Sequence, residues 1–167
     1  MIVINLIGGP GAGKSTLAHD LVSAMSKEGM SVEYISEYAK VLTWKERENT
    51  LKGHQPYIFE KQADMYFYLN GKVDYIVTDS PLILSSYYGK KYDNLPDCWF
   101  DYVFWKVNNY NNINIMVKRD HPYIENGRNQ DESEAETFAD EICEYMNSHG
   151  QPYEVYMSSN PKNVEKG

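Results

Sequence analysis

Cysteine is scarce in this sequence, which holds only Cys98 and Cys143 among its 167 residues. Two thiols so far apart are too few for a disulfide framework or a zinc site, so we expect a reducing compartment. Long hydrophobic runs are missing too, because the apolar run that opens the chain ends at Gly8 and no basic segment precedes it. This pattern is neither a signal peptide nor a membrane span, and we expect a cytoplasmic protein with no membrane partner.

Positive charge is also in short supply. Sixteen Lys and Arg stand against 24 Asp and Glu, which gives a net charge of -8 and a pI near 5.0. Such a balance argues against a protein that wraps nucleic acid by neutralising its phosphates. However, eight acidic residues and one basic residue fall between Glu125 and Glu144, so the rest of the chain carries a net charge of only -1. The acidic total therefore weakens the case for a nucleic-acid partner without excluding one.

Hydrophobic residues make up 42% of the chain, enough for one domain with a buried core. Apolar and β-branched runs predict strands at residues 2–7, 32–35, 75–78, 113–117 and 153–157. Helical spacing and capping signals predict helices at residues 14–28, 56–70, 96–107 and 133–149, with another that begins near Glu37. Strands that alternate with helices form parallel βαβ units. We therefore expect a three-layer α/β fold over residues 1–157, a polar tail at 158–167, and an active site at the carboxyl ends of the strands.

A glycine-rich segment follows the first predicted strand and leads into the first helix. It reads Gly8-Gly9-Pro10-Gly11-Ala12-Gly13-Lys14-Ser15, with Thr16 next, and fits the phosphate-loop pattern G-x-x-x-x-G-K-[ST]. Glycines let the backbone turn so that its N–H groups point at phosphate oxygens, and the helix N-terminus adds positive potential. Lys14 can then reach the β- and γ-phosphates, and Ser15 can hold Mg²⁺. We expect this loop to bind ATP.

Signatures of other nucleotide-binding classes are absent. Neither Asn-Lys-x-Asp nor Asp-x-x-Gly occurs in the chain, which argues against a GTPase. Asp79 is followed by Ser80 rather than by Glu, and no residues remain for a helical lid domain, which argues against an AAA-type motor. What remains is a small kinase, in which an acidic residue orients the acceptor and an arginine-bearing segment closes over the phosphates.

Two of the three arginines of the chain, Arg119 and Arg128, flank the loop between the fourth predicted strand and the next helix. Arginine suits bidentate phosphate contacts and stabilises negative charge on a transferring phosphoryl group. We therefore expect a lid at about residues 119–132. The alternative is a solvated surface loop with two ordinary arginines.

Together these features resemble a known family. The phosphate loop is followed in order by Ser36-Glu37-Tyr38, Gln62, Thr78-Asp79-Ser80 and the arginine-bearing loop. This order resembles the small P-loop nucleoside and nucleotide kinases. The layout is similar to that of the nicotinamide riboside kinase domain and of small phage and bacterial P-loop proteins often labelled AAA-type ATPases. The resemblance covers about residues 1–157 and implies the strand order 2-3-1-4-5.

Glu37 and Asp79 stand at the ends of two predicted strands. In the kinases that the chain resembles, an acid in the place of Glu37 holds the acceptor hydroxyl and takes its proton. Alternatively, Glu37 is an acid favoured by the dipole of the helix that it begins. Asp79 can hold Mg²⁺ or act as the base instead, and its alternative is a capping residue for a helix at Ser80-Pro81. The sequence leaves open which acid is the base.

Gln62 is a polar residue on an otherwise apolar helix face. Its amide can pair with a nucleobase or a nicotinamide-type amide, or it can be a buried glutamine satisfied by protein groups. Tyrosine rings can stack on the acceptor, with core packing as the alternative for each; the candidates are Tyr38, Tyr66, Tyr87 and Tyr88. We expect the substrate site to include Glu37, Tyr38, Gln62 and Tyr66.

The sequence therefore predicts an ATP- and Mg²⁺-dependent kinase that moves the γ-phosphoryl group to a nucleoside, a nucleotide or a related small molecule. Its predicted catalytic residues are Lys14, Glu37, Asp79, Arg119 and Arg128. One alternative is a kinase that acts on a nucleic-acid 5′-hydroxyl or modified base, which should show a basic groove with aromatic residues. Another is a regulatory nucleotide-binding ATPase without an acceptor. The sequence names neither the acceptor nor the oligomeric state.

Overall fold

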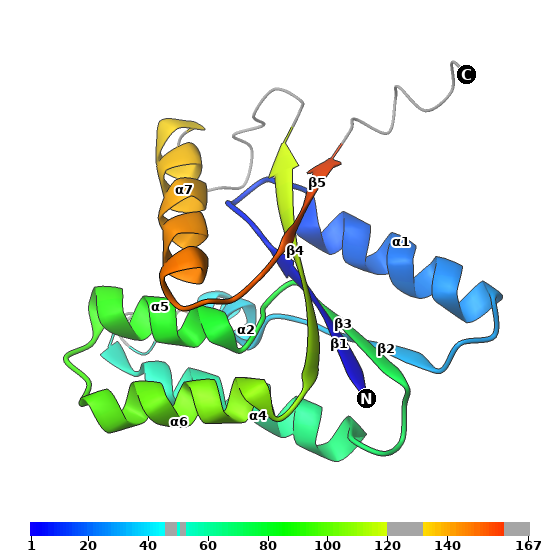
Figure 1. Ribbon diagram of the computed structural model, residues 1–167, viewed down its shortest axis with the longest axis horizontal. Coiled ribbons are helices and arrows are strands. Elements are labelled where there is room, and N and C mark those ends of the chain that lie inside the picture. The colour runs from blue at the N-terminus through cyan, green and yellow to red at the C-terminus, as the bar shows by residue number, and fades with distance from the viewer. Residues whose placement is uncertain (46–49, 51–52, 120–131, 159–167) are drawn as a thin grey trace.

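A parallel sheet of five strands forms the centre of the molecule (Figure 1). The structure is a computed structural model that describes residues 1–45, 50, 53–119 and 132–158. The strands lie in the order β2-β3-β1-β4-β5, and every neighbouring pair is parallel. Their bounds are β1 Ile2–Ile7, β2 Val32–Ile35, β3 Tyr75–Thr78, β4 Asn111–Arg119 and β5 Glu154–Ser158. This arrangement confirms the predicted fold class and strand order.

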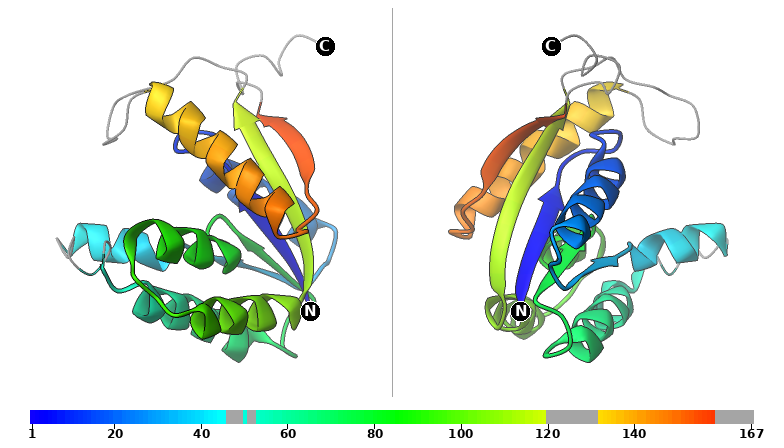
Figure 2. Two further views of the ribbon diagram at one scale, coloured as in Figure 1. Left: turned by 60° about the vertical axis from the view of Figure 1, so that its left-hand side comes forward. Right: turned by 90° about the vertical axis from the view of Figure 1, so that its right-hand side faces the viewer.

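Helices cover both faces of the sheet, which gives three layers (Figures 1 and 2). Their bounds are α1 Lys14–Lys27, α2 Tyr38–Trp44, α4 Gln55–Leu69, α5 Ile83–Tyr92, α6 Asp97–Asn108 and α7 Glu132–Ser148. Side chains of α1 pack on one face, where they join Leu6 and Val77 in a hydrophobic cluster. The opposite face, with Val3 and Met116, packs against α4, α5, α6 and α7. The alternation of apolar residues along β1 therefore supplies both halves of the core.

β1 lies at the centre of the sheet because both of its edges are paired. Residues 2–5 pair with residues 75–78 of β3, and residues 2–7 pair with residues 111–116 of β4. The chain passes from the carboxyl end of β1 directly into the phosphate loop. The loop is thereby anchored between the carboxyl ends of two neighbouring strands, where parallel α/β sheets bind their ligands.

β4 is longer than predicted because a buried amide network extends it. Nδ2 of Asn5 donates to Oδ1 of Asn112 and of Asn114, each at 2.9 Å. Asn112 in turn donates to the carbonyl oxygen of Val107 at the end of α6, at 2.8 Å. Asparagines whose amides are satisfied can remain within a buried strand, so β4 begins before the predicted residue 113. At its other end β4 continues past residue 117 because residues 118 and 119 pair with β5. The bounds of the other predicted strands and helices fall within about one residue of the prediction.

Cys98 and Cys143 are both free thiols. Within the residues that the structure describes, no helix is both long enough and apolar enough to cross a lipid bilayer.

Candidate functional site

The phosphate loop joins the carboxyl end of β1 to the first turn of α1, and two of its glycines leave no room for a side chain. A Cβ atom on Gly8, where φ is +153°, would lie 2.4 Å from the carbonyl oxygen of Val117. A Cβ atom on Gly13, where φ is +84°, would lie 2.9 Å from Oγ of Ser158. Glycine at these positions therefore lets the loop pass close to the ends of β4 and β5.

Lys14 lies in the first turn of α1, and its ammonium group turns back onto the loop. Nζ donates to the carbonyl oxygens of Gly8 and Gly9 at 2.9 and 3.0 Å. Gly13 precedes α1 as its N-cap in the left-handed conformation, and no side chain caps this helix. The loop thus combines a fixed positive charge with the positive end of a helix dipole, which is the combination that binds phosphate groups.

Ser15 and Asp79 meet beside the loop. Oγ of Ser15 donates to Oδ2 of Asp79 at 2.5 Å, which joins the start of α1 to the end of β3. Asp79 is only 9% exposed, and its Oδ1 has no hydrogen-bond partner in the described part of the chain. A buried carboxylate oxygen without a partner is costly. A hydroxyl beside a carboxylate is a donor set that suits Mg²⁺, so the residues present fit the predicted magnesium site.

This donor set is small. Among the described residues, no group of three or more His, Cys, Asp or Glu side chains is arranged to hold a metal ion. Mg²⁺ in nucleotide sites is usually bound through one or two carboxylates together with water and the phosphates of the substrate. The pair of Ser15 and Asp79 therefore suits a magnesium ion that arrives with a nucleotide better than a permanently bound metal.

Asp79 does not cap the helix that follows it. α5 begins at Ile83 with Leu82 as its N-cap, so the alternative that Asp79 is a capping residue is wrong. Thr78, the last residue of β3, is fully buried, and its hydroxyl donates to the carbonyl oxygen of Ile35 at 2.9 Å. This bond ties the end of β3 to the end of β2, which fixes the backbone from which Asp79 projects.

Glu37 follows β2 and reaches the same edge of the sheet. It is the N-cap residue of α2, but its side chain makes no capping hydrogen bond. Burial raises the pKa of the half-buried carboxyl, the positive charge of Lys14 opposes this rise, and the negative charge of Asp79 adds to it. Glu37, Lys14 and Asp79 lie in the segments that follow β2, β1 and β3, which are adjacent strands of the parallel sheet. The three residues therefore lie at the same edge of the sheet.

The predicted tyrosines divide between this edge and the core. Tyr66 is 1% exposed and lies in the hydrophobic core, which favours the core-packing alternative for this ring. Tyr38 begins α2, and its hydroxyl hydrogen bonds with the hydroxyl of Tyr57 on α4 at 2.9 Å. Burial and then the negative charge of Glu37 raise the pKa of Tyr88 on α5. Tyr38 and Tyr88 are therefore aromatic neighbours of Glu37, and so is Tyr34 on β2, whose pKa the charge of Glu37 also raises.

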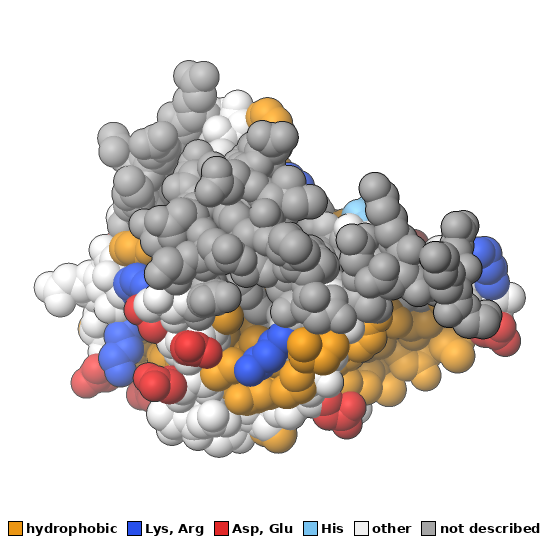
Figure 3. All heavy atoms as spheres, turned by 90° about the horizontal axis from the view of Figure 1, so that it is seen from above, with side chains coloured by type: hydrophobic (Ala, Val, Ile, Leu, Met, Phe, Trp, Pro, Cys, Tyr) orange, Lys and Arg blue, Asp and Glu red, His pale blue; other side chains and the backbone are white. Residues whose placement is uncertain are grey.

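Figure 3 looks down on the molecule toward the carboxyl ends of the strands. Among the described residues, hydrophobic side chains gather along one side of this view, and charged side chains lie at their border and between them.

The amide of Gln62 is engaged within the protein. The residue is 3% exposed, its Oε1 accepts from the backbone N–H of Tyr38 at 2.9 Å, and its Nε2 donates to the carbonyl oxygen of Ser36 at 3.2 Å. Of the two roles predicted for Gln62, these bonds favour a buried glutamine satisfied by protein groups. Its direct contact with a substrate stays a prediction.

Sequence reasoning missed Tyr34 and His19. Burial and then the negative charge of Asp79 raise the pKa of Tyr34. The ring of His19 lies 4.7 Å from the ring of Tyr34, and its Nδ1 lies 2.6 Å from the carbonyl oxygen of Ser15. The pairing of β2 with β3 places Tyr34 opposite Val77, close to Asp79. This pairing could have predicted that Tyr34 lies near Asp79, but it can be derived only when the strand order is known.

The predicted arginines can be placed only in part. Arg119 is the last residue of β4, so its backbone lies at the carboxyl end of the sheet. Arg128 lies outside the described residues, as do residues 120–131 of the lid predicted at 119–132. The contribution of these arginines to the site stays a prediction.

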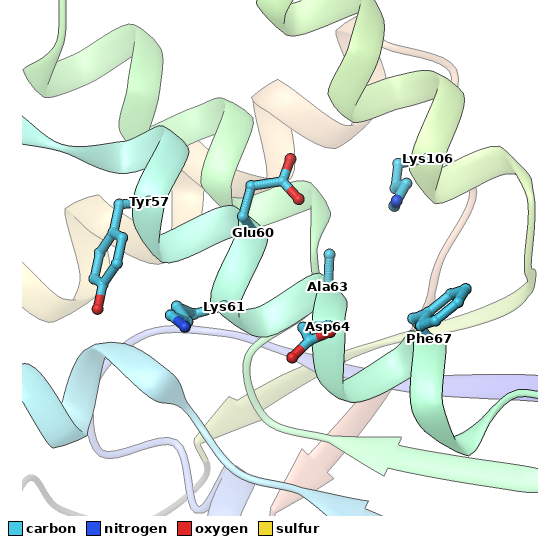
Figure 4. A pocket seen from close by; sticks show the side chains of 7 residues that line it. All are labelled: Tyr57, Glu60, Lys61, Ala63, Asp64, Phe67 and Lys106. Carbon is cyan, nitrogen blue, oxygen red and sulfur yellow. The ribbon is translucent and has the colours of Figure 1, made fainter.

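A separate cavity of about 310 Å³ lies along α4 (Figure 4). Six of its seven lining residues belong to α4, and Lys106 of α6 completes it. Acidic and basic side chains both line the cavity, namely Glu60, Asp64, Lys61 and Lys106. The cavity contains none of the residues predicted for catalysis or substrate binding. The phosphate loop and its neighbours are therefore the candidate site.

Comparison with known proteins supports the same fold. The sequence profile of the AAA domain family matches residues 3–162. Thymidylate kinase from Ehrlichia chaffeensis has a TM-score of 0.60 at 14% identity, over 96% of this chain and 89% of that one. The NadR protein in complex with NR has a TM-score of 0.60 at 16% identity, over 98% of this chain but only 45% of that one. At these identities the likeness shows the fold alone, which is that of P-loop kinases. No curated protein matches the sequence.

Proposed function

This chain belongs to the AAA domain family, and from that premise we propose that it is an ATP- and Mg²⁺-dependent phosphotransferase. The acceptor is a hydroxyl or phosphate group of a nucleoside, a nucleotide or a related small molecule. Family and fold support a P-loop nucleotide-binding protein with a kinase-like architecture, and the arrangement of the site supports the transfer reaction. The proposed catalytic unit is residues 1–157, with Arg119 and Arg128 on its lid.

One observation carries the proposal, namely the convergence of Lys14, Asp79 and Glu37 at one edge of the sheet. After burial, the charges of Lys14 and Asp79 are the largest influences on the pKa of Glu37. A carboxylate beside the loop, outside the pair of Ser15 and Asp79, can orient an attacking hydroxyl and take its proton.

The residues of the chain divide the reaction among them. The loop and Lys14 hold the β- and γ-phosphates and stabilise the negative charge that develops during transfer. Ser15 and Asp79 would hold Mg²⁺, which neutralises charge on phosphate oxygens when it is bound. Glu37 accepts a hydrogen bond from the acceptor hydroxyl and takes its proton. We assign the base to Glu37 rather than Asp79, because Asp79 is engaged with Ser15.

The proposed acceptor class rests on the site and on the similar structures. Tyr38 and Tyr88 are aromatic neighbours of Glu37, which suits an acceptor that carries a ring. Thymidylate kinase acts, by its name, on a nucleotide, and the NadR protein was solved in complex with NR. These compounds define the small molecules with which a search for the acceptor should begin.

A label-transfer experiment tests the proposal. The protein is incubated with γ-labelled ATP, Mg²⁺ and a panel of nucleosides, nucleoside monophosphates, nicotinamide riboside and oligonucleotides. Label on a small molecule supports the proposed function, whereas label on oligonucleotides alone supports a nucleic-acid kinase. Label that appears only as free phosphate supports a regulatory ATPase and defeats both kinase functions. Glu37→Gln should reduce transfer, while Glu33→Gln, at an exposed position of β2, should not.

A further inference from the structure

The buried amide of Gln62 hydrogen bonds to the backbone on both sides of Glu37. Its Oε1 accepts from the N–H of Tyr38, the residue after Glu37, and its Nε2 donates to the carbonyl oxygen of Ser36, the residue before it. One side chain of α4 thus holds the backbone on both sides of the proposed base. We propose that Gln62 is a positioning residue that sets the place of the Glu37 carboxylate, an inference that rests on the function proposed for Glu37.

The same stretch of backbone is held from other directions too. The hydroxyl of Thr78 on β3 donates to the carbonyl oxygen of Ile35 at 2.9 Å. The hydroxyl of Tyr38 hydrogen bonds with that of Tyr57 on α4 at 2.9 Å. Contacts from β3 and α4 therefore hold residues 35–38. Within this stretch Glu37 supplies the acid, and Gln62 makes the two bonds that flank it directly.

The position of Glu37 makes such support necessary. Glu37 stands between β2 and α2, with φ of -66° and ψ of 117°, and its side chain makes no hydrogen bond to the start of the helix. The carboxylate is therefore placed by the backbone that carries it. Displacement of a catalytic group by about 1 Å can slow a reaction by about 100-fold. A buried amide with both partners on one short segment limits that displacement.

A double-mutant cycle in the full chain tests the inference. Gln62→Met keeps the length of the side chain and removes both hydrogen bonds, and Gln62→Glu keeps the acceptor for Tyr38 but loses the donor to Ser36. The assay measures transfer from labelled ATP to nicotinamide riboside, thymidine and thymidine monophosphate. It is applied to both Gln62 variants, to Glu37→Gln and to the double variant that combines Gln62→Met with Glu37→Gln.

Gln62→Met should lower kcat by about 10- to 100-fold with the KM for ATP unchanged. Gln62→Glu should lose less. The double variant should be no slower than Glu37→Gln alone, because a group that acts only through Glu37 has nothing to position once that carboxylate is gone. Losses that multiply in the double variant would overturn the inference.

Asn114→Leu provides the matched control. Asn114 is 7% exposed, and its amide accepts from Asn5 and donates to the carbonyl oxygen of Pro152, each at 2.9 Å. It lies on β4, which two strands separate from β2. This variant also loses two buried amide bonds, so we expect a lower melting temperature with kcat within about twofold of the wild type. An equal loss of kcat in Asn114→Leu would show that Gln62 acts only through the stability of the fold, which would overturn the inference.

A second measurement is independent of turnover. The ¹³C resonance of the Glu37 carboxyl is titrated in the wild type, in Gln62→Met and in Asn114→Leu. Among the described residues, the charged groups that act on Glu37 are Lys14, Asp79 and Lys40, and the neighbouring titratable hydroxyls are those of Tyr34 and Tyr88. A released carboxylate gains water, so its pKa should fall toward the ordinary value in Gln62→Met and stay unchanged in Asn114→Leu.

The two experiments separate the inference from the function on which it rests. Normal transfer by Glu37→Gln would remove Glu37 from the reaction, whatever the titration shows. Slow transfer by Glu37→Gln, with an unchanged titration of Glu37 in Gln62→Met and in Gln62→Glu, would leave the proposed function standing and overturn the role of Gln62. Should Gln62→Met fail to fold, Gln62→Glu supplies both readouts.

Discussion

Lys14 is the residue on which the handling of phosphate should depend most. Its Nζ lies against the carbonyl oxygens of Gly8 and Gly9 in the loop. Lys14→Ala should lower kcat for label transfer by about 100-fold or more, because one preorganised donor at a developing charge is worth that much. Circular dichroism should show an unchanged fold. Lys27→Ala, at the exposed end of the same helix, is the control, and full activity of Lys14→Ala would contradict the phosphate-loop assignment.

The carboxyl of Glu37 should make turnover depend on pH. Burial raises the pKa of this group, the positive charge of Lys14 lowers it, and the negative charge of Asp79 raises it. A base must be ionised to take a proton, so kcat/KM should rise with pH through a pKa above that of an ordinary glutamate, since kcat/KM reports the groups of the free protein. Glu37→Gln should lose this rise, which a series of kcat/KM measurements across pH tests directly.

The same group should make stability depend on pH, in the opposite direction. Because its pKa is raised in the folded protein without ligand, the folded state holds the proton more tightly than the unfolded state. The contribution of Glu37 to stability is therefore fully present below the ordinary pKa of glutamate and is lost as pH rises through the raised pKa. Urea denaturation should show Glu37→Gln gaining stability relative to the wild type across that window. A constant difference at all pH values would contradict the raised pKa.

At the scale of residues, sequence reasoning was strongest where the chemistry is contiguous. Lys14 and Ser15 belong to one short motif whose geometry is local, so their places followed from the sequence. Gln62 and Tyr34 find their partners through the packing of α4 and the pairing of β2 with β3. Neither the partners of a buried amide nor the register of a parallel strand is encoded within a few residues of the group concerned.

Among the elements, α5 and α6 are in close contact at Gly89. A Cβ atom at this position would lie 2.5 Å from Cζ3 of Trp99. Gly89→Ala should therefore force the two helices apart and cost about 1–3 kcal/mol, as overpacking of a core typically does. Urea denaturation measures the loss. Gly53→Ala is the control, because the nearest atom to its Cβ would be 4.0 Å away, and equal effects of the two changes would contradict the argument.

The secondary structure followed from the sequence because its signals are strong and local. β1 and β3 are short apolar runs, and Pro56 and Gly71 mark the two ends of α4. The early start of β4 did not follow, because Oδ1 of Asn112 accepts from Asn5, which lies far from it in the chain. Nor did the sequence decide which tyrosines lie inside. The periodicity of a helix defines its faces, but only packing decides which face is covered.

For the whole molecule, nucleotide binding should appear as added stability. A ligand at 100 times its Kd stabilises the folded state by about 2.7 kcal/mol, which corresponds to a rise in Tm of about 5–10 °C for a domain of this size. Differential scanning fluorimetry with ATP and Mg²⁺ should show this rise. Addition of EDTA should reduce it, because Ser15 and Asp79 would lose the metal between them and the phosphates. Lys14→Ala should show little of the rise, and an undiminished rise in that variant would argue against binding at the loop.

The central place of β1 also governs how the chain can fold as it is made. Both neighbours of β1, at residues 75–78 and 111–116, come much later in the sequence. A nascent chain leaves the ribosome from its N-terminal side, so the apolar segment Ile2–Ile7 emerges without a partner on either edge. It stays open to chaperones and to other nascent chains until β3 and then β4 have been translated. The strand that leads into the phosphate loop is thus made before its neighbours, and it can pair on both edges only after β3 and β4 have been made.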